Sequence, residues 1–402
     1  MPDTPVPSFF CPTRIHMGIG ARSALADILA SHGCRSVLIL VDPALRQGVF
    51  FADVCRIVDA AGCARAVFSA IEPEPSIETV DKAHTVQRES GAQLLVALGG
   101  GSTIDTAKAV GILATNGGAI ADYEGMARFS TPPLPLVAIP STAGTGSEVS
   151  GSCVITNPAA HRKMSIRHPA LNPAAHAILD PESLVSAPPH VIAHAGIDAF
   201  VHAFESYISR LANPMTDALN LRAIELIHQN LRALVRRPAD LDAGLAMLCG
   251  ASLTGMAFGQ TGLGNVHCMA RFVGAQFGLS HGLSNGLCLP AVARFNMEAD
   301  RAKFARLARA MDAPVQGLGE RETAGEAIER IEQLCSDIGL PAGLRAAGAD
   351  RTHFEAMASD CMKAGYEKWN PRATTHEDFL ALFEQAWEPA SRARPDTRAV
   401  AA

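Results

Sequence analysis

Four polar side chains in the second half of the chain have the types and the spacing of metal ligands. Asp198 and His202 lie four residues apart, and His267 and His281 lie fourteen residues apart in a glycine-rich stretch. Together they offer one carboxylate oxygen and three imidazole nitrogens. Such a set suits Fe(II) or Zn(II) and leaves room for a substrate oxygen. The four residues therefore indicate a metal-dependent reaction.

The sequence around the first pair favours a buried site. Residues at i and i+4 share a helix face, and the segment 196–204 around Asp198 and His202 is strongly apolar. A lone pair of this kind is more often a surface hydrogen bond. Burying two ionisable groups without a partner is costly, however, and metal coordination offsets that cost. His190 and His194 continue the spacing backwards, but the run from 190 to 202 spans about 18 Å at about 1.5 Å per residue, too far for one ion.

A run of glycines in the first half indicates a second kind of chemistry. It lies between an apolar segment, 93–98, and a helix-compatible segment, 103–113. Glycines let a backbone approach a diphosphate closely, and the following helix N-terminus offers free N–H groups. The run is neither G-x-G-x-x-G nor a Walker loop, so the prediction of a dinucleotide site rests on its position between a strand and a helix. We expect a dinucleotide to bind at Gly99, Gly100, Gly101 and Ser102.

Three other polar features lie near the carboxyl ends of expected strands, and each allows two interpretations. Asp105, in the first turn of the expected helix, either belongs to the cofactor site or caps the helix. The loop 140–148, PSTAGTGSE, either wraps a ribose or phosphate or forms an ordinary turn. Asp42 either binds the adenosine ribose, which favours NAD over NADP, or forms an Asp-Pro turn.

The elements that must position these groups change character near residue 187. Apolar runs first alternate with helical segments, which indicates an α/β domain with a parallel sheet. The expected strands are 36–41, 64–68, 93–98 and 134–139, and helices are expected around 45–61 and 76–90. A hairpin follows Cys153, with its turn near 157–160 and a return strand at 163–167, and 177–179 closes the sheet edge. Beyond residues 186–189 the period is 3.6 almost throughout. We therefore predict an α/β dinucleotide-binding domain at 1–187 and an all-helical domain at 188–402.

Composition excludes several classes of protein. The 402 residues are 48% hydrophobic and 18% charged, as in globular proteins, and the net charge of −6 argues against nucleic-acid binding. The N-terminus has no basic and apolar leader, and the most apolar window, 244–264, is interrupted by small and polar residues. We interpret that window as a buried helix that a neighbour approaches closely. Ten scattered cysteines without a C-x-x-C pair are typical of a soluble, cytoplasmic chain with reduced thiols. Cys268, beside a proposed ligand, is either a thiol ligand or a small buried hydrophobe.

Over nearly its whole length the sequence resembles the iron-containing (group III) alcohol dehydrogenases. The resemblance rests on several long motifs in the same order. They are FCPTRI at 10–15, GGGSTIDTAK at 99–108, IPSTAGTGSE at 139–148, LDPE at 179–182, GIDAFVH at 196–202, His267 with His281-Gly282, and NPR at 370–372.

This resemblance implies a dehydroquinate synthase-like fold, with an α/β NAD(P)-binding domain, a helical metal-binding domain and a cleft between them. It implies reversible hydride transfer between an alcohol and an aldehyde or ketone, with the substrate oxygen polarised by the metal, and a homodimer or larger homo-oligomer. The implied ligands of Fe(II), or of Zn(II) as the alternative, are Asp198, His202, His267 and His281. The implied cofactor site comprises Asp42, Gly99, Gly100, Gly101, Ser102, Asp105, Ser141, Thr142, Thr145 and Lys163.

The chain departs from the family pattern at one position in the predicted site. Four residues after His267 the family commonly has another histidine, and here the residue is Arg271. Arginine stays protonated at neutral pH, so it does not replace a histidine proton relay. One hypothesis is that Arg271 pairs with a carboxylate, phosphonate or sulfonate of a small anionic substrate. The alternative is a salt bridge to a nearby acid or a contact with a cofactor phosphate.

Three rival functions stay open on the residues alone. One is a zinc-dependent relative of glycerol dehydrogenase or dehydroquinate synthase, against which the GTGSE loop and the four-ligand set argue. Another is a non-catalytic NAD-binding protein, which the intact ligand set disfavours. The third is a metallohydrolase, for which NADH binding is the discriminating observation.

Overall fold

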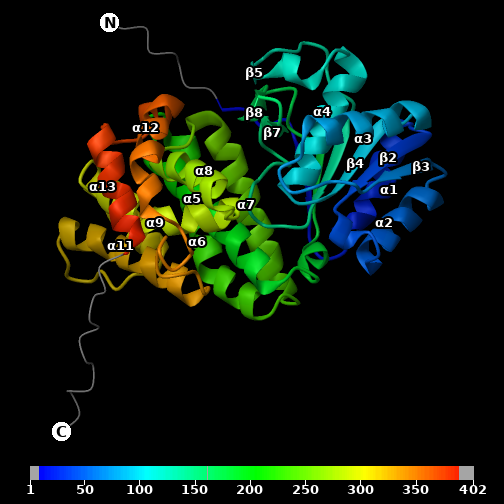
Figure 1. Ribbon diagram of the computed structural model, residues 1–402. Coiled ribbons are helices and arrows are strands. Elements are labelled where there is room, and N and C mark those ends of the chain that lie inside the picture. Colours follow the sequence, from blue (N-terminus) through cyan, green and yellow to red (C-terminus); the bar gives the residue numbers. More distant parts are fainter. Residues whose placement is uncertain (1–8, 161, 389–402) are drawn as a thin grey trace, which may run out of the picture.

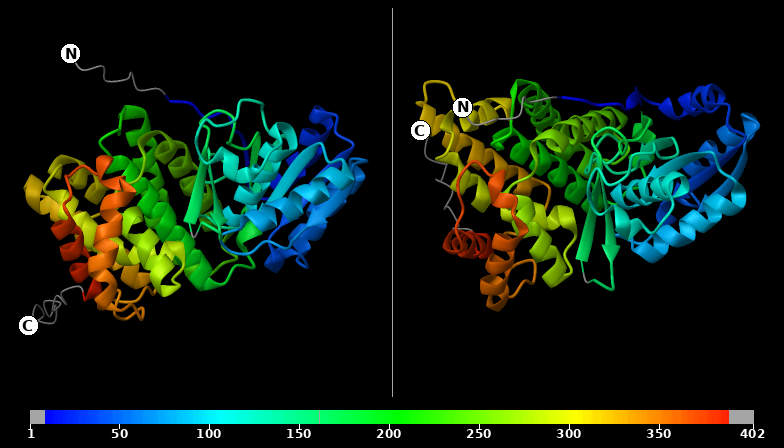
Figure 2. Two further views of the ribbon diagram at one scale, coloured as in Figure 1. Left: turned by 45° about the horizontal axis from the view of Figure 1, so that its top comes forward. Right: turned by 90° about the horizontal axis from the view of Figure 1, so that it is seen from above.

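The computed structural model describes residues 9–160 and 162–388, in two halves that lie side by side (Figure 1). The N-terminal half contains a six-stranded sheet with helices on both faces. The C-terminal half is built of helices. Both views in Figure 2 place a two-stranded hairpin, formed by β7 and β8, between the halves.

The large sheet is parallel throughout, as the alternating strands and helices predict. Its order is β1-β9-β6-β4-β2-β3. The strands are β1 (Arg14–Met17), β2 (Ser36–Val41), β3 (Ala64–Phe68), β4 (Leu94–Gly99), β6 (Leu136–Pro140) and β9 (His176–Leu179). The four strands expected from continuous apolar runs are confirmed, each to within two residues.

The central strands are apolar on both sides because helices cover both faces. Leu38 and Leu40 of β2 pack in the core that contains α3 (Ile77–Ser90) and α4 (Gly101–Asn116). Val37 and Ile39 pack in the opposite core with α1 (Ala24–His32) and α2 (Val49–Ala60). Successive residues of a strand point to opposite faces, so a strand between two cores has no polar face.

Four details of the first half differ from the prediction. The segment 177–179 does not close the sheet, because β1 pairs with β9 and forms the edge. Strand β1 was missed because its sequence, RIHM, is half exposed and has no apolar run. Helix α4 begins at Gly101, so Asp105 lies beyond its first turn. The expected helix 45–61 is interrupted at Gly48, with the short helix η2 (Pro43–Leu45) before α2.

The hairpin expected after Cys153 is confirmed. Strands β7 (Ser152–Asn157) and β8 (Arg162–Arg167) pair antiparallel, and Asn157 lies opposite Arg162. A short strand, β5 (Gly125–Met126), follows the short helix η3 (Ile120–Tyr123) and completes this second sheet.

After Leu179, the regular elements of the described residues are all helical. The long helices are α5 (Pro189–Ile208), α6 (Pro214–Arg236), α7 (Leu241–Thr261), α8 (Asn265–Phe277), α9 (His281–Met297), α10 (Arg301–Ala310), α11 (Glu320–Asp337), α12 (Phe354–Ala364) and α13 (His376–Trp387). Short helices are η1 (Ala21–Ser23), η4 (Pro181–Leu184), η5 (Arg351–His353) and η6 (Tyr366–Lys368). The change of structure falls between β9 and α5, and the exact boundary at 187 stays a prediction.

Helix α7 has glycines where other segments approach it. By length and composition alone it could cross a membrane, a test that core helices of soluble proteins also pass. A Cβ at Gly250 would lie 3.0 Å from Ile227 of α6, and one at Gly255 would lie 2.5 Å from the Gly146 carbonyl oxygen. The small residues of the window 244–264 thus allow the close approach expected of a packed helix.

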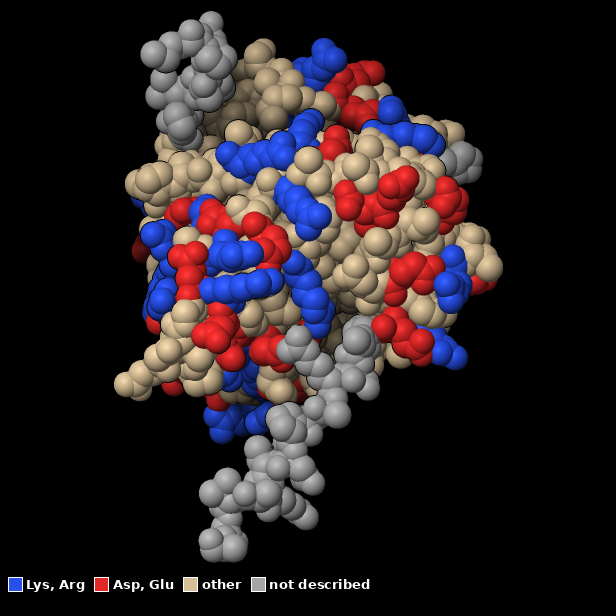
Figure 3. All heavy atoms as spheres, turned by 90° about the vertical axis from the view of Figure 1, so that its left-hand side faces the viewer, with Lys and Arg blue, Asp and Glu red and all other residues tan. Residues whose placement is uncertain are grey.

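The outer face of the helical half carries charges of both signs. Lysine and arginine side chains are interspersed there with aspartate and glutamate (Figure 3). This mixed surface contrasts with the continuous basic stripe that tracks a nucleic-acid backbone.

Candidate functional site

Three of the predicted metal ligands converge from three helices. Asp198 comes from the middle of α5, His267 from the first turn of α8, and His281 is the first residue of α9. Asp198 Oδ1 lies 3.9 Å from His267 Nε2 and 3.6 Å from His281 Nε2. One ligand atom from each of the three residues falls within 4.8 Å of the others. Helix packing therefore brings together three residues that lie far apart in the sequence.

His202 lies beside this triad with an unsatisfied ring nitrogen. Its Nδ1 is 3.8 Å from Asp198 Oδ2, and it is buried without a hydrogen-bond partner among the described residues. The ring centroid is 4.6 Å from that of His267. Burial lowers the pKa of His202 to about 3, so its imidazole is neutral at physiological pH. Buried nitrogens are normally paired, so a neutral, unpaired one facing a carboxylate fits a metal ligand.

The surroundings of Asp198 lower the pKa of its carboxyl group. Although burial raises the pKa of the carboxyl, the surrounding His202, His281 and His267 rings and a hydrogen bond from Asn285 bring it below its ordinary value. The lowered pKa favours the ionised carboxylate, which is the form of Asp198 that binds a divalent cation.

Glu205 is a part of the site that the sequence analysis missed. It lies on α5, three residues after His202, and its carboxylate accepts hydrogen bonds from the Val266 N–H at 2.6 Å and from the His267 N–H at 3.3 Å. Its Oε2 also lies 2.6 Å from His267 Nδ1. A proton held on Nδ1 by this carboxylate leaves Nε2 as the lone-pair nitrogen, the usual arrangement behind a metal-binding histidine. The spacing 198, 202, 205 on one helix face was the signal that could have found it.

Asn285 is the second missed residue. It lies one turn after His281 on α9, and its amide nitrogen is 2.7 Å from Asp198 Oδ1, 3.3 Å from His267 Nε2 and 3.2 Å from His281 Nε2. Its Oδ1 is buried without a partner among the described residues. The amide thus connects three of the four candidate ligands. Only the packing of α9 against α5 and α8 reveals this position.

The two loops predicted to bind the dinucleotide lie against each other. Strands β4 and β6 are parallel neighbours, so the loops that follow them start at the same end of the sheet. A Cβ at Gly100 would lie 3.1 Å from Thr142 Oγ1, and one at Gly101 would lie 2.8 Å from Thr145 Cγ2. A side chain at Gly101 would therefore have to displace Thr145, and one at Gly100 would crowd Thr142. The close contact forms one surface from Gly99–Ser102 and Ser141–Thr145 at the carboxyl end of the sheet, where ligands of open α/β sheets bind.

The same loop also contacts two helices of the C-terminal half, α5, which carries Asp198, and α7. A Cβ at Gly144 would lie 2.9 Å from the carbonyl oxygen of Ala195, which precedes Asp198 on α5. Gly146, at φ 59°, contacts Gly255 of α7. The loop therefore connects the proposed dinucleotide site to the ligand cluster.

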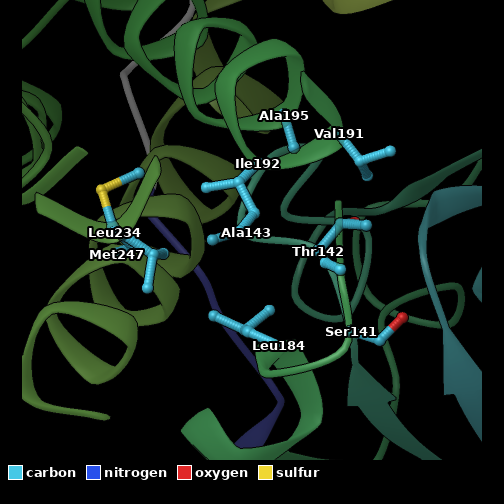
Figure 4. Close-up of a pocket in the computed structure, with 10 residues that line it drawn as sticks. Ser141, Thr142, Ala143, Leu184, Val191, Ile192, Ala195, Leu234 and Met247 are labelled. Atoms are coloured by element: carbon cyan, nitrogen blue, oxygen red, sulfur yellow. The ribbon is translucent and has the colours of Figure 1, made fainter. Parts of the chain in front are cut away.

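A small apolar cavity lies beneath this loop (Figure 4). It is lined by loop residues 141–143 and by side chains of η4, α5, α6 and α7. Its volume of about 10 Å³ is close to that of a single water probe, so it is a packing defect at the junction of the halves and holds no dinucleotide.

Asp105 and Asp42 both make hydrogen bonds within the protein. Asp105 does not cap α4, whose N-cap is Gly100; its carboxylate accepts hydrogen bonds from Ser147 Oγ at 2.5 Å and from the Val154 N–H at 2.9 Å. It therefore holds the second loop and the hairpin to α4. Asp42 accepts a hydrogen bond from the Ala44 N–H at 2.9 Å, as in the expected Asp-Pro turn. Contact of either residue with a cofactor stays a prediction.

Lys163 and Ser102 both contact Glu74. Lys163 Nζ lies 2.5 Å from Glu74 Oε1, and Ser102 Oγ accepts a hydrogen bond from the Glu74 N–H at 3.3 Å. Desolvation lowers the pKa of His281, although 45% of its side chain is exposed, and the charges of Lys163 and Glu74 act on it in opposite directions. The ion pair from the α/β half therefore lies near the exposed ligand of the helical half.

The remaining predicted residues separate into different environments. Arg271 follows His267 by one turn on α8 and is partly buried, with the phenol of Tyr366 beside it. Cys268 is buried with its thiol toward the carbonyl oxygen of Cys361 at 3.6 Å, which supports its reading as a small hydrophobe. His194 bonds Ser280 and lies outside the ligand cluster, as the helix spacing predicts.

Comparison with known proteins gives consistent matches over both halves. Residues 12–181 match the profile of the iron-containing alcohol dehydrogenases, and residues 192–387 match that of the C-terminal part of the same family. Lactaldehyde reductase of Escherichia coli K12 is 38% identical over 372 residues, which cover 92% of this chain and 97% of that protein.

Solved structures of the same kind superimpose closely. A crystal structure of 1,3-propanediol oxidoreductase, 36% identical, has a TM-score of 0.93 and covers 95% of this chain and 100% of its own. Sulfoacetaldehyde reductase from Bifidobacterium kashiwanohense in complex with NAD⁺, 26% identical, has a TM-score of 0.84 and covers 95% of this chain and 99% of its own.

Proposed function

The chain belongs to the iron-containing alcohol dehydrogenase family and is an alcohol and aldehyde oxidoreductase, and we propose that it works with NAD and one divalent metal ion. The observation that carries the proposal is the convergence of Asp198, His267 and His281, with the unpaired nitrogen of His202 beside them. A hydrolase needs no dinucleotide surface next to such a cluster.

Asp198, His202, His267 and His281 would hold the metal, with Fe(II) as the first choice and Zn(II) as the alternative. When bound, the metal would supply Lewis acidity toward a substrate oxygen, and the nicotinamide would accept or donate a hydride. The chain's own contribution is to keep the donor atoms oriented and correctly protonated. Glu205 does so for His267, and Asn285 does so for Asp198.

The dinucleotide would lie on the surface formed by the two loops. Backbone N–H groups of Gly99, Gly100, Gly101 and Ser102, from the end of β4 to the start of α4, would receive the pyrophosphate. Hydroxyls of Ser141, Thr142 and Thr145 lie next to them. Asp105 supports this surface through Ser147, and Lys163 would reach the cofactor from β8 after leaving Glu74.

We propose NAD rather than NADP. Asp42 lies at the end of β2, where a carboxylate pairs with ribose hydroxyls and repels a 2′-phosphate. The relative solved with NAD⁺ supports the same preference. A homodimer or larger assembly in the cytoplasm is a further expectation from the family.

The test is aldehyde-dependent NADH oxidation by protein stripped of metal and reloaded anaerobically with Fe(II) or Zn(II). Metal-dependent turnover is expected, with NADPH a poorer donor than NADH. Turnover of fully stripped protein would refute the metal role, and equal use of both cofactors would refute the role of Asp42. NADH binding without turnover of any carbonyl would favour the non-catalytic alternative.

A further inference from the structure

Arg271 is a partly buried cation for which the described residues offer no carboxylate within ion-pair distance. Two other arginines of low exposure have such a partner: Arg22 binds Asp180 at 2.9 Å, and Arg232 binds Asp337 at 2.6 Å. What Arg271 has instead is a neutral neighbour, the phenol of Tyr366 in η6. Burial raises the pKa of Tyr366, and the guanidinium beside it partly opposes that rise.

A phenol can accept only a few of the hydrogen bonds that a guanidinium donates, and it does not neutralise the charge. The guanidinium presents five N–H donors in a planar fork and keeps its charge at any physiological pH. A phenolic oxygen accepts one or two hydrogen bonds and brings no negative charge. Withdrawing a cation from water without a counter-anion is costly, so the environment of Arg271 is completed best by an anion that enters the site.

The helix determines where that anion would lie. Arg271 and His267 are four residues apart on α8, so both side chains leave the same helix face, separated by about 6 Å along the axis. His267 Nε2 points into the ligand cluster with Asp198. A molecule that extends from the cluster along α8 therefore reaches Arg271 after a few bonds.

We propose that Arg271, with Tyr366 beside it, binds the anionic group of a short aldehyde or alcohol whose reacting carbon lies at the ligand cluster. The inference rests on the proposed function and adds its substrate class. The anionic group is a carboxylate, sulfonate or phosphonate, planar or tripodal oxyanions that accept two N–H bonds from one guanidinium. The spacing along α8 corresponds to roughly two to four bonds between the carbonyl carbon and that group.

Two alternative partners of Arg271 are an acid of the protein and a cofactor phosphate, and a different observation bears on each. A salt bridge within the protein is absent among the described residues. A cofactor phosphate would have to come from the loops after β4 and β6, in the other half of the molecule, and this alternative makes a distinct kinetic prediction: the KM for NADH would rise with every substrate.

The experiment compares 4-oxobutanoate with its methyl ester, which differ in charge but not in the reacting carbonyl. Metal-loaded wild type, Arg271→Gln and Arg271→Lys are assayed with NADH. Arg345→Gln is the matched control, because it removes the same charge at a side chain that is 62% exposed and pairs with Glu388. Thermal unfolding of each variant shows that it is folded.

In Arg271→Gln we expect kcat/KM for 4-oxobutanoate to fall by about 10- to 100-fold, while the ester changes by less than about twofold. Arg271→Lys should lie between, since lysine keeps the charge and loses the fork. Arg345→Gln should leave the ratio of the two substrates unchanged. An equal loss on both substrates, or a raised KM for NADH with both, overturns the inference while leaving the proposed function intact.

If no variant, wild type included, reduces either aldehyde, the anion site is decided by binding, and the proposed function is decided separately by its own test with other carbonyl compounds. Calorimetric titration of metal-loaded protein with succinate then compares wild type with Arg271→Gln. Tighter binding by wild type supports the inference. Equal affinities overturn it.

Discussion

Replacing Glu205 by glutamine tests whether the carboxylate behind His267 prepares the metal site. Three N–H groups converge on its two oxygens: the Val266 N–H at 2.6 Å, the His267 N–H at 3.3 Å, and His267 Nδ1 at 2.6 Å. Glutamine has one acceptor oxygen and one donor NH₂ group. Whichever way it turns, at least one buried N–H faces another donor, and the negative charge that favours protonated Nδ1 is lost.

The magnitude follows from two effects. A buried donor without an acceptor costs about 1–3 kcal/mol of stability. Loss of the residue that orients a ligand histidine weakens metal binding by about 10- to 100-fold. We therefore expect Glu205→Gln to lower the free energy of unfolding of the metal-free protein, and also to reduce the additional stabilisation that metal provides.

The assay is competition for Zn(II) with a chelator of known affinity, together with urea unfolding of metal-free and metal-loaded protein. Glu384→Gln is the control, because this carboxylate is exposed and pairs with Arg351. A Glu205→Gln protein that binds Zn(II) as tightly as wild type would refute the reasoning, even if its stability were reduced.

Three further predictions concern metal retention, packing and pH. Asn285→Ala removes the amide that contacts three candidate ligands, so metal affinity measured by chelator competition should fall by about tenfold; unchanged affinity would contradict its positioning role. Gly255→Ala places a Cβ 2.5 Å from the Gly146 carbonyl oxygen and should cost about 1–3 kcal/mol in urea unfolding. Gly259→Ala, whose Cβ would have no atom of the described residues within 4 Å, should be neutral or stabilising. His228 is buried, neither of its ring nitrogens has a hydrogen-bond partner within residues 9–160 and 162–388, and burial lowers its pKa from 6.5 to about 4. Its neutral form is favoured by the fold, so stability is fully present above pH 6.5 and is lost as the pH falls toward 4. Urea unfolding at pH 7 and 4.5 should show a smaller loss for His228→Phe than for wild type, and equal losses would exclude His228 as a source of the acid sensitivity.

Local sequence pattern predicted most of the scaffold. The continuous apolar runs at β2, β4 and β6 indicate strands because a strand covered on both faces must be apolar at nearly every position. Strand β1 could not be predicted in this way, because its sequence has polar side chains and its pairing with β9 depends on residues far away in the chain. Asp105 was expected in the first turn of the helix after the glycine loop and lies just beyond that turn, and its bonds to Ser147 and Val154 arise from the fold of a distant segment.

The sequence by itself determined the types of groups available for chemistry: a carboxylate and an imidazole at helical spacing, two further imidazoles in a glycine-rich stretch, glycines after a buried strand, and an arginine one turn beyond a histidine. Residue type and local period depend on near neighbours only, so they can be read along the chain. Only the tertiary structure decided which groups meet. The packing of α5, α8 and α9 brings Asp198, His267 and His281 together and adds Glu205 and Asn285 behind them. Contacts of this kind depend on how whole helices pack in three dimensions, and no local pattern encodes that.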